Sequence, residues 1–153
     1  METINELARE TPIIHSTEVL VVGSGPGGLA AAIASARAGE ETNLLERYGW
    51  FGGNITQVGV EGLAWYRHDK TIDSEGIGIE FEERAKTMCA SNPEPQSNSH
   101  AIDGEAFKYV ADVLVEDVKG LAIFGNHSPT MFPDYSNTLI SGQSAVSVIL
   151  SLI

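Results

Sequence analysis

The sequence contains a single cysteine, Cys89, in a chain of 153 residues. One cysteine excludes an internal disulfide and a multi-cysteine metal site, and we expect Cys89 to be a small buried or half-exposed thiol. Positive charge is also scarce, because 9 Lys and Arg residues against 21 Asp and Glu residues give a net charge of −12. This balance predicts that neither nucleic acid nor an anionic membrane is a partner, since both are polyanions.

Two kinds of hydrophobic segment are missing as well. Residues 1–6 are polar and acidic, and do not form the basic and apolar regions of a secretory signal. No apolar run is long enough to span a membrane. The chain has the composition of a globular protein, with 42% apolar residues, and we expect it in the cytoplasm.

A glycine-rich turn is the most specific feature that is present. Residues 19–22 form a short β-branched apolar run, which is typical of a strand buried in a parallel sheet. Gly23, Gly25 and Gly28 then match G-x-G-x-x-G. In this motif the first glycine permits a tight turn, the second lets the backbone approach a pyrophosphate, and the third lets a helix pack on the strand. Pro26 suits the first turn of that helix, whose free N–H groups bind anions.

The residues after the turn complete a strand–helix–strand unit. Small helix-forming residues fill positions 29–38, and Gly39 stands where such a helix ends. A second strand follows over 42–45 and ends at Glu46, 18 positions after Gly28. This spacing is close to that of the acidic residue that accepts hydrogen bonds from an adenosine ribose. A carboxylate there would repel a 2′-phosphate, which argues against NADP.

A glycine pair, Gly52-Gly53, follows the acidic residue closely. The sequence resembles the FAD-dependent oxidoreductases of the two-dinucleotide-binding-domain type, related to fumarate reductase flavoproteins. The motifs that carry this resemblance are Val-Val-Gly-Ser-Gly-Pro-Gly-Gly and Glu-Arg-Tyr-Gly-x-x-Gly-Gly. NAD-binding domains generally lack this pair. The resemblance implies that the pyrophosphate is held by Gly23, Gly25, Pro26 and Gly27. It also implies that Glu46 and Arg47 meet the ribose, and that the glycine pair passes close to the cofactor. The predicted site comprises Gly23, Ser24, Gly25, Pro26, Gly27, Gly28, Glu46, Arg47, Gly52 and Gly53.

The segment after the glycine pair carries aromatic and charged side chains. The resemblance implies that this segment runs beside the flavin. Trp65 or Tyr66 could then cover the flavin ring, and Arg67 or His68 could supply charge near a substrate anion. The alternative is an ordinary loop with solvated charges. No acid–base pair follows from the spacing, so the catalytic residues stay open.

Further elements are expected downstream. Apolar residues at helical spacing predict an amphipathic helix over 77–88. Residues 91–100 are rich in Ser, Asn and Pro, which predicts a loop. Asp103 is a good N-cap for a second helix with an apolar stripe that reaches residue 114. The apolar run 121–124 would then return to the sheet as a third parallel strand.

Charge nearly disappears toward the C-terminus. Lys119 and Asp134 are the only charged residues of the last 36, and residues 136–153 have none. We predict an arm over 1–16, a partial dinucleotide-binding domain over 17–125, and an apolar tail without the resemblance over 126–153. One hypothesis is an N-terminal fragment with a foreign tail, as after a frameshift; the alternative is a natural short form.

The predicted fold class is therefore α/β, a Rossmann-like FAD/NAD(P)-binding domain with a truncated parallel sheet. The predicted function is the FAD-binding portion of an FAD-dependent oxidoreductase, which transfers hydride or electrons to or from a small-molecule substrate. Two alternatives stay open at this point. One is an NAD-binding dehydrogenase module, and the other is a non-catalytic remnant that at most binds nucleotide. The oligomeric state is left open.

Overall fold

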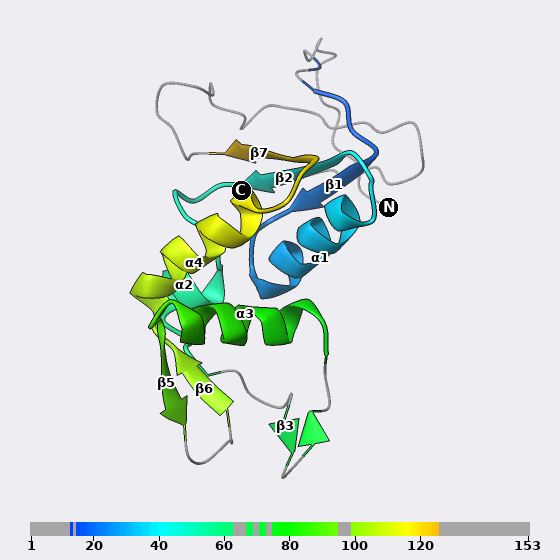
Figure 1. Ribbon diagram of the computed structural model, residues 1–153. Helices are drawn as coiled ribbons and strands as arrows, with labels where there is room; N and C mark the ends of the chain where they lie inside the picture. The colour runs from blue at the N-terminus through cyan, green and yellow to red at the C-terminus, as the bar shows by residue number, and fades with distance from the viewer. Residues whose placement is uncertain are drawn as a thin grey trace, which may run out of the picture.

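A three-stranded parallel sheet forms the top layer of the molecule (Figure 1). The computed structural model describes residues 13, 15–62, 67–68, 71–72, 75–94 and 99–125. The strands are β1 (Val19–Val22), β2 (Thr42–Glu46) and β7 (Leu121–Gly125), in the order β1-β2-β7. Val22 lies opposite Leu45, and Glu46 lies opposite Gly125, so the carboxyl ends of the strands share one edge. Both flanking strands pair with β2 in parallel, which confirms the α/β prediction.

Two helices cover one face of this sheet, α1 (Pro26–Arg37) and α4 (Gly104–Glu116) (Figure 1). Side chains alternate between the two faces of a strand, and β2 turns Leu44 toward the helices. Small residues in α1 allow close packing on the sheet, as the sequence predicted. The core side chains that are almost fully buried include Leu29, Ile33, Leu44, Phe107, Val110 and Leu114.

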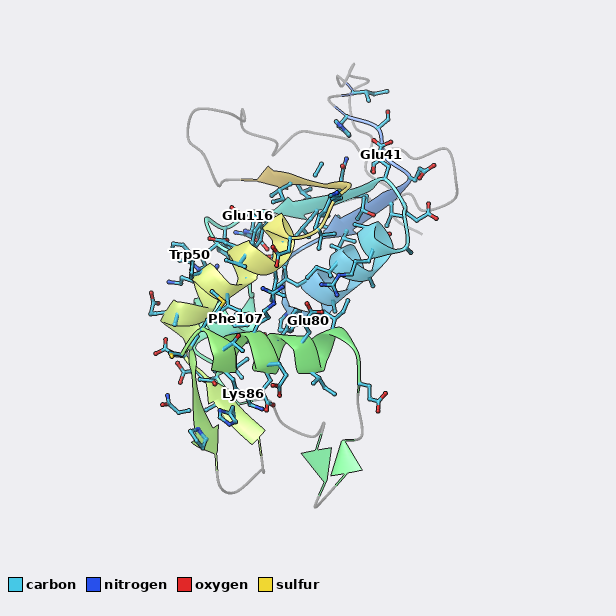
Figure 2. All side chains as sticks on the ribbon, viewed as in Figure 1. Glu41, Trp50, Glu80, Lys86, Phe107 and Glu116 are labelled. Carbon is cyan, nitrogen blue, oxygen red and sulfur yellow. The ribbon has the colours of Figure 1, made fainter. Side chains whose placement is uncertain are left out.

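A third layer is the amphipathic helix α3 (Ile77–Thr87), which packs beneath α1 and α4 (Figure 1). Its Phe81 ring meets the Phe107 ring edge-on, with centroids 5.9 Å apart. Figure 2 shows Glu80 and Phe107 where α3 faces the layer above it. Arg37 donates two hydrogen bonds to Glu80, at 2.6 and 2.8 Å. These bonds lower the pKa of Glu80 against the opposing effect of partial burial.

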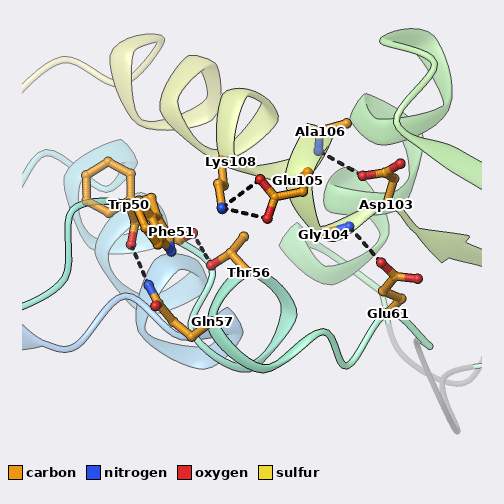
Figure 3. Close-up of polar contacts among 10 residues, drawn as sticks. All are labelled: Trp50, Phe51, Thr56, Gln57, Glu61, Asp103, Gly104, Glu105, Ala106 and Lys108. Atoms are coloured by element: carbon orange, nitrogen blue, oxygen red, sulfur yellow. Dashed lines mark hydrogen bonds and ion pairs between the residues drawn. The ribbon is translucent and has the colours of Figure 1, made fainter.

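Most of the predicted elements are confirmed. The strands at 19–22, 42–46 and 121–125 and the helices over 77–87 and 104–116 fall where the patterns placed them. The side chain of Asp103 caps α4, because it accepts a hydrogen bond from the N–H of Ala106 at 2.9 Å (Figure 3). A short helix, α2 (Asn54–Val58), was not predicted. The predicted boundaries at 17 and 126 stay predictions.

The predicted loop over 91–100 is wrong. Residues there form two antiparallel strands, β5 (Ser91–Glu94) and β6 (Ser99–Ile102), with Ser91 paired to Ile102. Backbone hydrogen bonds, which are nearly indifferent to side-chain type, hold this pair. A second small pair, β3 (Arg67–His68) and β4 (Thr71–Ile72), was not predicted either. The residues proposed to cover the flavin ring, Trp65 and Tyr66, lie outside the described residues.

Cys89 is exposed, rather than buried or half-exposed as predicted. It follows the end of α3 with φ of 56°, and is the one non-glycine residue in the described part of the chain with a positive φ. The N–H of Ala90 donates to the carbonyl of Ala85 at 2.7 Å, which closes the helix end. This is the position that helices commonly fill with glycine. None of the helices in the described ranges is both long and apolar enough to cross a bilayer.

Candidate cofactor site

The glycine turn lies between the end of β1 and the start of α1. Gly23 has φ of +90°, which permits the sharp turn predicted for it. Gly25 is the N-cap of α1, and no side chain caps this helix, whereas Asp103 caps α4. A Cβ atom added to Gly25 or Gly27 would meet nothing within 4 Å. The first N–H groups of a helix have no acceptor within it. The turn thus offers free donors and open space to an anion.

Gly28 closes the packing of α1 on the turn. An added Cβ atom would overlap the carbonyl oxygen of Gly23 and lie 3.0 Å from the carbonyl carbon. It would also lie 3.7 Å from Cγ1 of Val21 on β1. Backbone cannot yield as a flexible side chain can. The close helix–strand packing that the motif predicted for Gly28 is therefore present.

The loop after β2 folds back onto the glycine turn. The N–H of Gly52 donates to the carbonyl of Ser24 at 2.9 Å. Gly53 has φ of +52°, and a Cβ atom on it would lie 2.6 Å from Cα of Gly25. A Cβ atom on Gly52 would lie 2.5 Å from Cγ2 of Thr56. Contacts inside the protein thus require both glycines. The sequence predicted only that the pair passes close to a cofactor, and did not predict these contacts.

Glu46 ends β2 beside the same turn, and its side chain is buried, with 6% exposure. One carboxylate oxygen, Oε2, accepts from the N–H of Ser24 at 2.7 Å and from its hydroxyl at 2.5 Å. The other oxygen, Oε1, accepts from the N–H groups of Arg47 and Tyr48 at 2.7 and 2.9 Å. Glu46 is therefore built into the turn, rather than being a solvated strand end.

Aromatic side chains flank the loop on its outer side. The Arg47 guanidinium lies 5.0 Å from the centre of the Tyr48 ring, and both residues are exposed. Lys108 of α4 lies 4.1 Å from the centre of the Trp50 ring and also pairs with Glu105 (Figure 3). These contacts fix the outer wall of the loop. The contact between Lys108 and Trp50 was not predicted, because the two residues are 58 positions apart in the sequence.

Other supports of the loop were also missed by sequence reasoning. The Thr56 hydroxyl donates to the carbonyl of Phe51 at 2.6 Å, and Glu61 accepts from the N–H of Gly104 at 3.1 Å (Figure 3). An added Cβ atom on Gly104 would lie 2.8 Å from the carbonyl oxygen of Ile55. The close approach of Gly104 to Ile55 joins the start of α4 to α2. The single glycine at this helix start was the available signal for such an approach.

The structure brings the predicted residues together at one edge of the sheet. Ser24 contacts both Glu46 and Gly52, and Gly53 lies against Gly25. The turn is completed by Gly23, Pro26, Gly27 and Gly28. Only the Arg47 side chain points elsewhere, toward Tyr48. Whether these residues contact a cofactor stays a prediction.

A family model described as FAD dependent oxidoreductase matches residues 18–150. The chain belongs to the FAD dependent oxidoreductase family. This membership confirms the predicted family and the prediction of FAD as its cofactor. The match continues beyond residue 125, into residues 126–150. The division of the chain into a domain over 17–125 and a tail over 126–153 stays a prediction.

The relatives of this chain include a thiazole synthase and a dehydrogenase. A thiamine thiazole synthase from Metallosphaera sedula is 36% identical over 110 residues, which cover 66% of this chain and 38% of the relative. A dihydrolipoyl dehydrogenase from Geobacillus stearothermophilus is 34% identical over 113 residues, covering 71% of this chain and 24% of the relative. The chain therefore spans well under half the length of these relatives.

Among solved structures, Thermovibrio ammonificans THI4 aligns with 71% of this chain and 37% of its own. The sequence identity is 20% and the TM-score is 0.45.

The residues present fit the diphosphate of FAD, and the carboxylate that we expect to meet its ribose lies beside the same turn. The open Cβ positions of Gly25 and Gly27 form a cradle that side chains would fill. This cradle adjoins the uncapped start of α1, where a negative charge is favoured. Glu46, which the sequence predicted as the acceptor of hydrogen bonds from the ribose, lies against the same turn.

Proposed function

We propose that this chain supplies the pyrophosphate- and adenosine-binding half of an FAD site in an oxidoreductase that acts on a small molecule. The supporting observation is the hydrogen bond of 2.7 Å from the Ser24 N–H to Glu46. It joins the anion-binding turn after β1 to the acidic end of β2, so one surface presents donors for phosphate and an acceptor for ribose. When bound, the flavin supplies the hydride or electron transfer.

The protein's own residues bind and orient in this proposal. The N–H groups at the start of α1 hold the diphosphate, and Gly25 and Gly27 leave room for it. Glu46 accepts hydrogen bonds from the ribose and disfavours a 2′-phosphate by charge repulsion. Gly52 and Gly53 keep the loop against the turn, which holds Glu46 in register with the anion site. A small-molecule substrate and a cytoplasmic location remain predictions.

Calorimetric titration of the purified chain with FAD, NAD and NADP tests this proposal. We expect FAD to bind and NADP to be rejected. Glu46→Ala should weaken FAD binding at least tenfold, because a hydrogen bond to a charged group contributes about 1.5–3 kcal/mol. Glu116→Ala, at an exposed glutamate near the end of α4, should leave binding unchanged. A chain that ignores FAD, or that binds NAD in its place, would refute the proposal.

A further inference from the structure

The carboxylate of Glu46 has no acceptor position to spare. A carboxylate offers about four lone-pair positions to hydrogen-bond donors. Four donors of this chain surround Glu46: the N–H and hydroxyl of Ser24, the N–H of Arg47, and the N–H of Tyr48. Ser24 is fully buried and Glu46 is 6% exposed, so water does not compete strongly for these positions. A ribose hydroxyl can reach this carboxylate only if one of the four donors gives way or shares.

The four donors differ in their freedom to move. Three of them are backbone N–H groups. The turn after β1 fixes the N–H of Ser24, and the chain leaving β2 fixes the N–H groups of Arg47 and Tyr48. The carbonyl of Ser24 also accepts from Gly52, which anchors that peptide further. The Ser24 hydroxyl alone can turn away by rotation of its side chain, without any movement of the backbone.

We propose, on the basis of the proposed function, that the Ser24 hydroxyl occupies the ribose-hydroxyl position on Glu46 and is displaced when a nucleotide binds. A buried carboxylate that lacks a donor is costly. The serine hydroxyl therefore satisfies Glu46 in the ligand-free chain and competes with the ribose for it. Ser24 thus acts through Glu46 and lowers the affinity of the chain for nucleotides that carry ribose hydroxyls.

Titration of the full chain with two matched ligands tests this inference. The ligands are ADP and 2′,3′-dideoxyadenosine diphosphate, which lacks both ribose hydroxyls. Ser24→Ala removes the competitor, so ADP should bind about fivefold to tenfold more tightly. The dideoxy ligand should bind Ser24→Ala and the unsubstituted chain equally. A merely structural role for Ser24 would change the affinity for both ligands alike.

Two further variants make the result unambiguous. Ser35→Ala is the matched control, since Ser35 lies in α1 and its hydroxyl accepts a hydrogen bond from Thr42 instead of donating to Glu46. It should leave both affinities unchanged. Ser24→Gly, which also lacks the hydroxyl, replaces Ser24→Ala if that variant does not fold, and should show the same gain for ADP alone. Thermal unfolding of each free variant verifies that it is folded before titration.

The outcomes separate the two proposals. If the unsubstituted chain binds neither ADP nor FAD, the proposed function is wrong and this inference falls with it. If it binds them but removal of the Ser24 hydroxyl does not tighten ADP, or tightens the dideoxy ligand equally, the displacement is refuted while the FAD site stands.

Discussion

The Cα atom of Gly25 lies 2.6 Å from the point that a Cβ atom on Gly53 would occupy. The phosphate-binding turn and the loop after the acidic strand are therefore in backbone-to-backbone contact. Neither side of the contact has a flexible side chain that could move aside. The contact makes glycine at position 53 a structural requirement of the site, whatever the cofactor contributes.

We expect Gly53→Ala to destabilise the fold more than Gly59→Ala. Both glycines have positive φ values, +52° and +75°, so alanine strains both. A Cβ atom on Gly59 meets nothing within 4 Å, whereas one on Gly53 meets the turn. Overpacking should add about 1–3 kcal/mol to the loss at position 53. Urea unfolding of both variants measures the difference, and equal losses would contradict the contact.

Two glycines at the start of α1, Gly27 and Gly28, should respond to alanine with opposite changes in the free energy of unfolding. Gly28→Ala should lower the free energy of unfolding by at least about 1–3 kcal/mol, because its Cβ atom would overlap Gly23. Gly27→Ala has open space and a helical position, so it should raise stability by up to about 1 kcal/mol.

The same Gly27→Ala variant should nevertheless bind FAD more weakly, since its methyl group enters the proposed phosphate cradle. Thermal unfolding and FAD titration of one preparation give both results. A variant that gains stability and keeps full affinity would place the phosphates elsewhere.

The ion pair between Arg37 and Glu80 should make stability depend on pH. The hydrogen bond from Arg37 lowers the pKa of Glu80 in the folded chain below its ordinary value of 4.5. A lowered pKa means that the stabilisation is complete above the unfolded pKa and is lost as pH falls through the folded pKa. Glu80→Gln should cost about 0.2–1 kcal/mol at pH 7, because both side chains are partly exposed.

Urea unfolding between pH 7 and pH 3 measures this difference. The loss caused by Glu80→Gln should shrink toward zero at the acidic end, and also in high salt, which screens exposed pairs. Glu116→Gln is the control at an exposed position near the end of α4. A loss that stays constant across the pH range would show that it does not come from the charge of Glu80.

Cys89→Gly should stabilise the protein by about 1 kcal/mol, since a left-handed backbone costs a non-glycine residue roughly 1–2 kcal/mol. Cys89→Ala removes the same thiol but keeps the Cβ atom, and should change stability little. Thermal unfolding under reducing conditions compares the two variants. Equal melting temperatures would mean that the backbone at position 89 carries no strain.

Local patterns predicted much of the fold because each obeys a short-range rule. The β-branched run at 19–22, the glycine turn and the N-cap at Asp103 each carry their physical cause within a few residues. The β5–β6 pair could not be predicted in this way. Its Ser, Asn and Pro residues favour a loop, and only backbone pairing across the two segments stabilises it as strands.

The site shows the same division between local and long-range causes. Spacing placed Glu46 near the glycine turn, but could not show that Ser24, 22 positions earlier, fills its acceptor positions. The glycine pair was predicted for closeness to a cofactor, while packing against Gly25 and Thr56 already requires it. Such contacts depend on how three segments meet in space, which no local pattern encodes.

The N–H of Ser24 and the N–H of Gly52 cross the same boundary in opposite directions, one to Glu46 and the other to the carbonyl of Ser24. The Gly52 bond breaks when the loop separates from the turn, and the Ser24 bond breaks when the turn separates from the end of β2. We expect these three segments to open as one unit, so amide hydrogen exchange should give the two protons matching protection and one shared opening free energy. Their exchange rates would report how often the loop after β2 lifts from the glycine turn in solution.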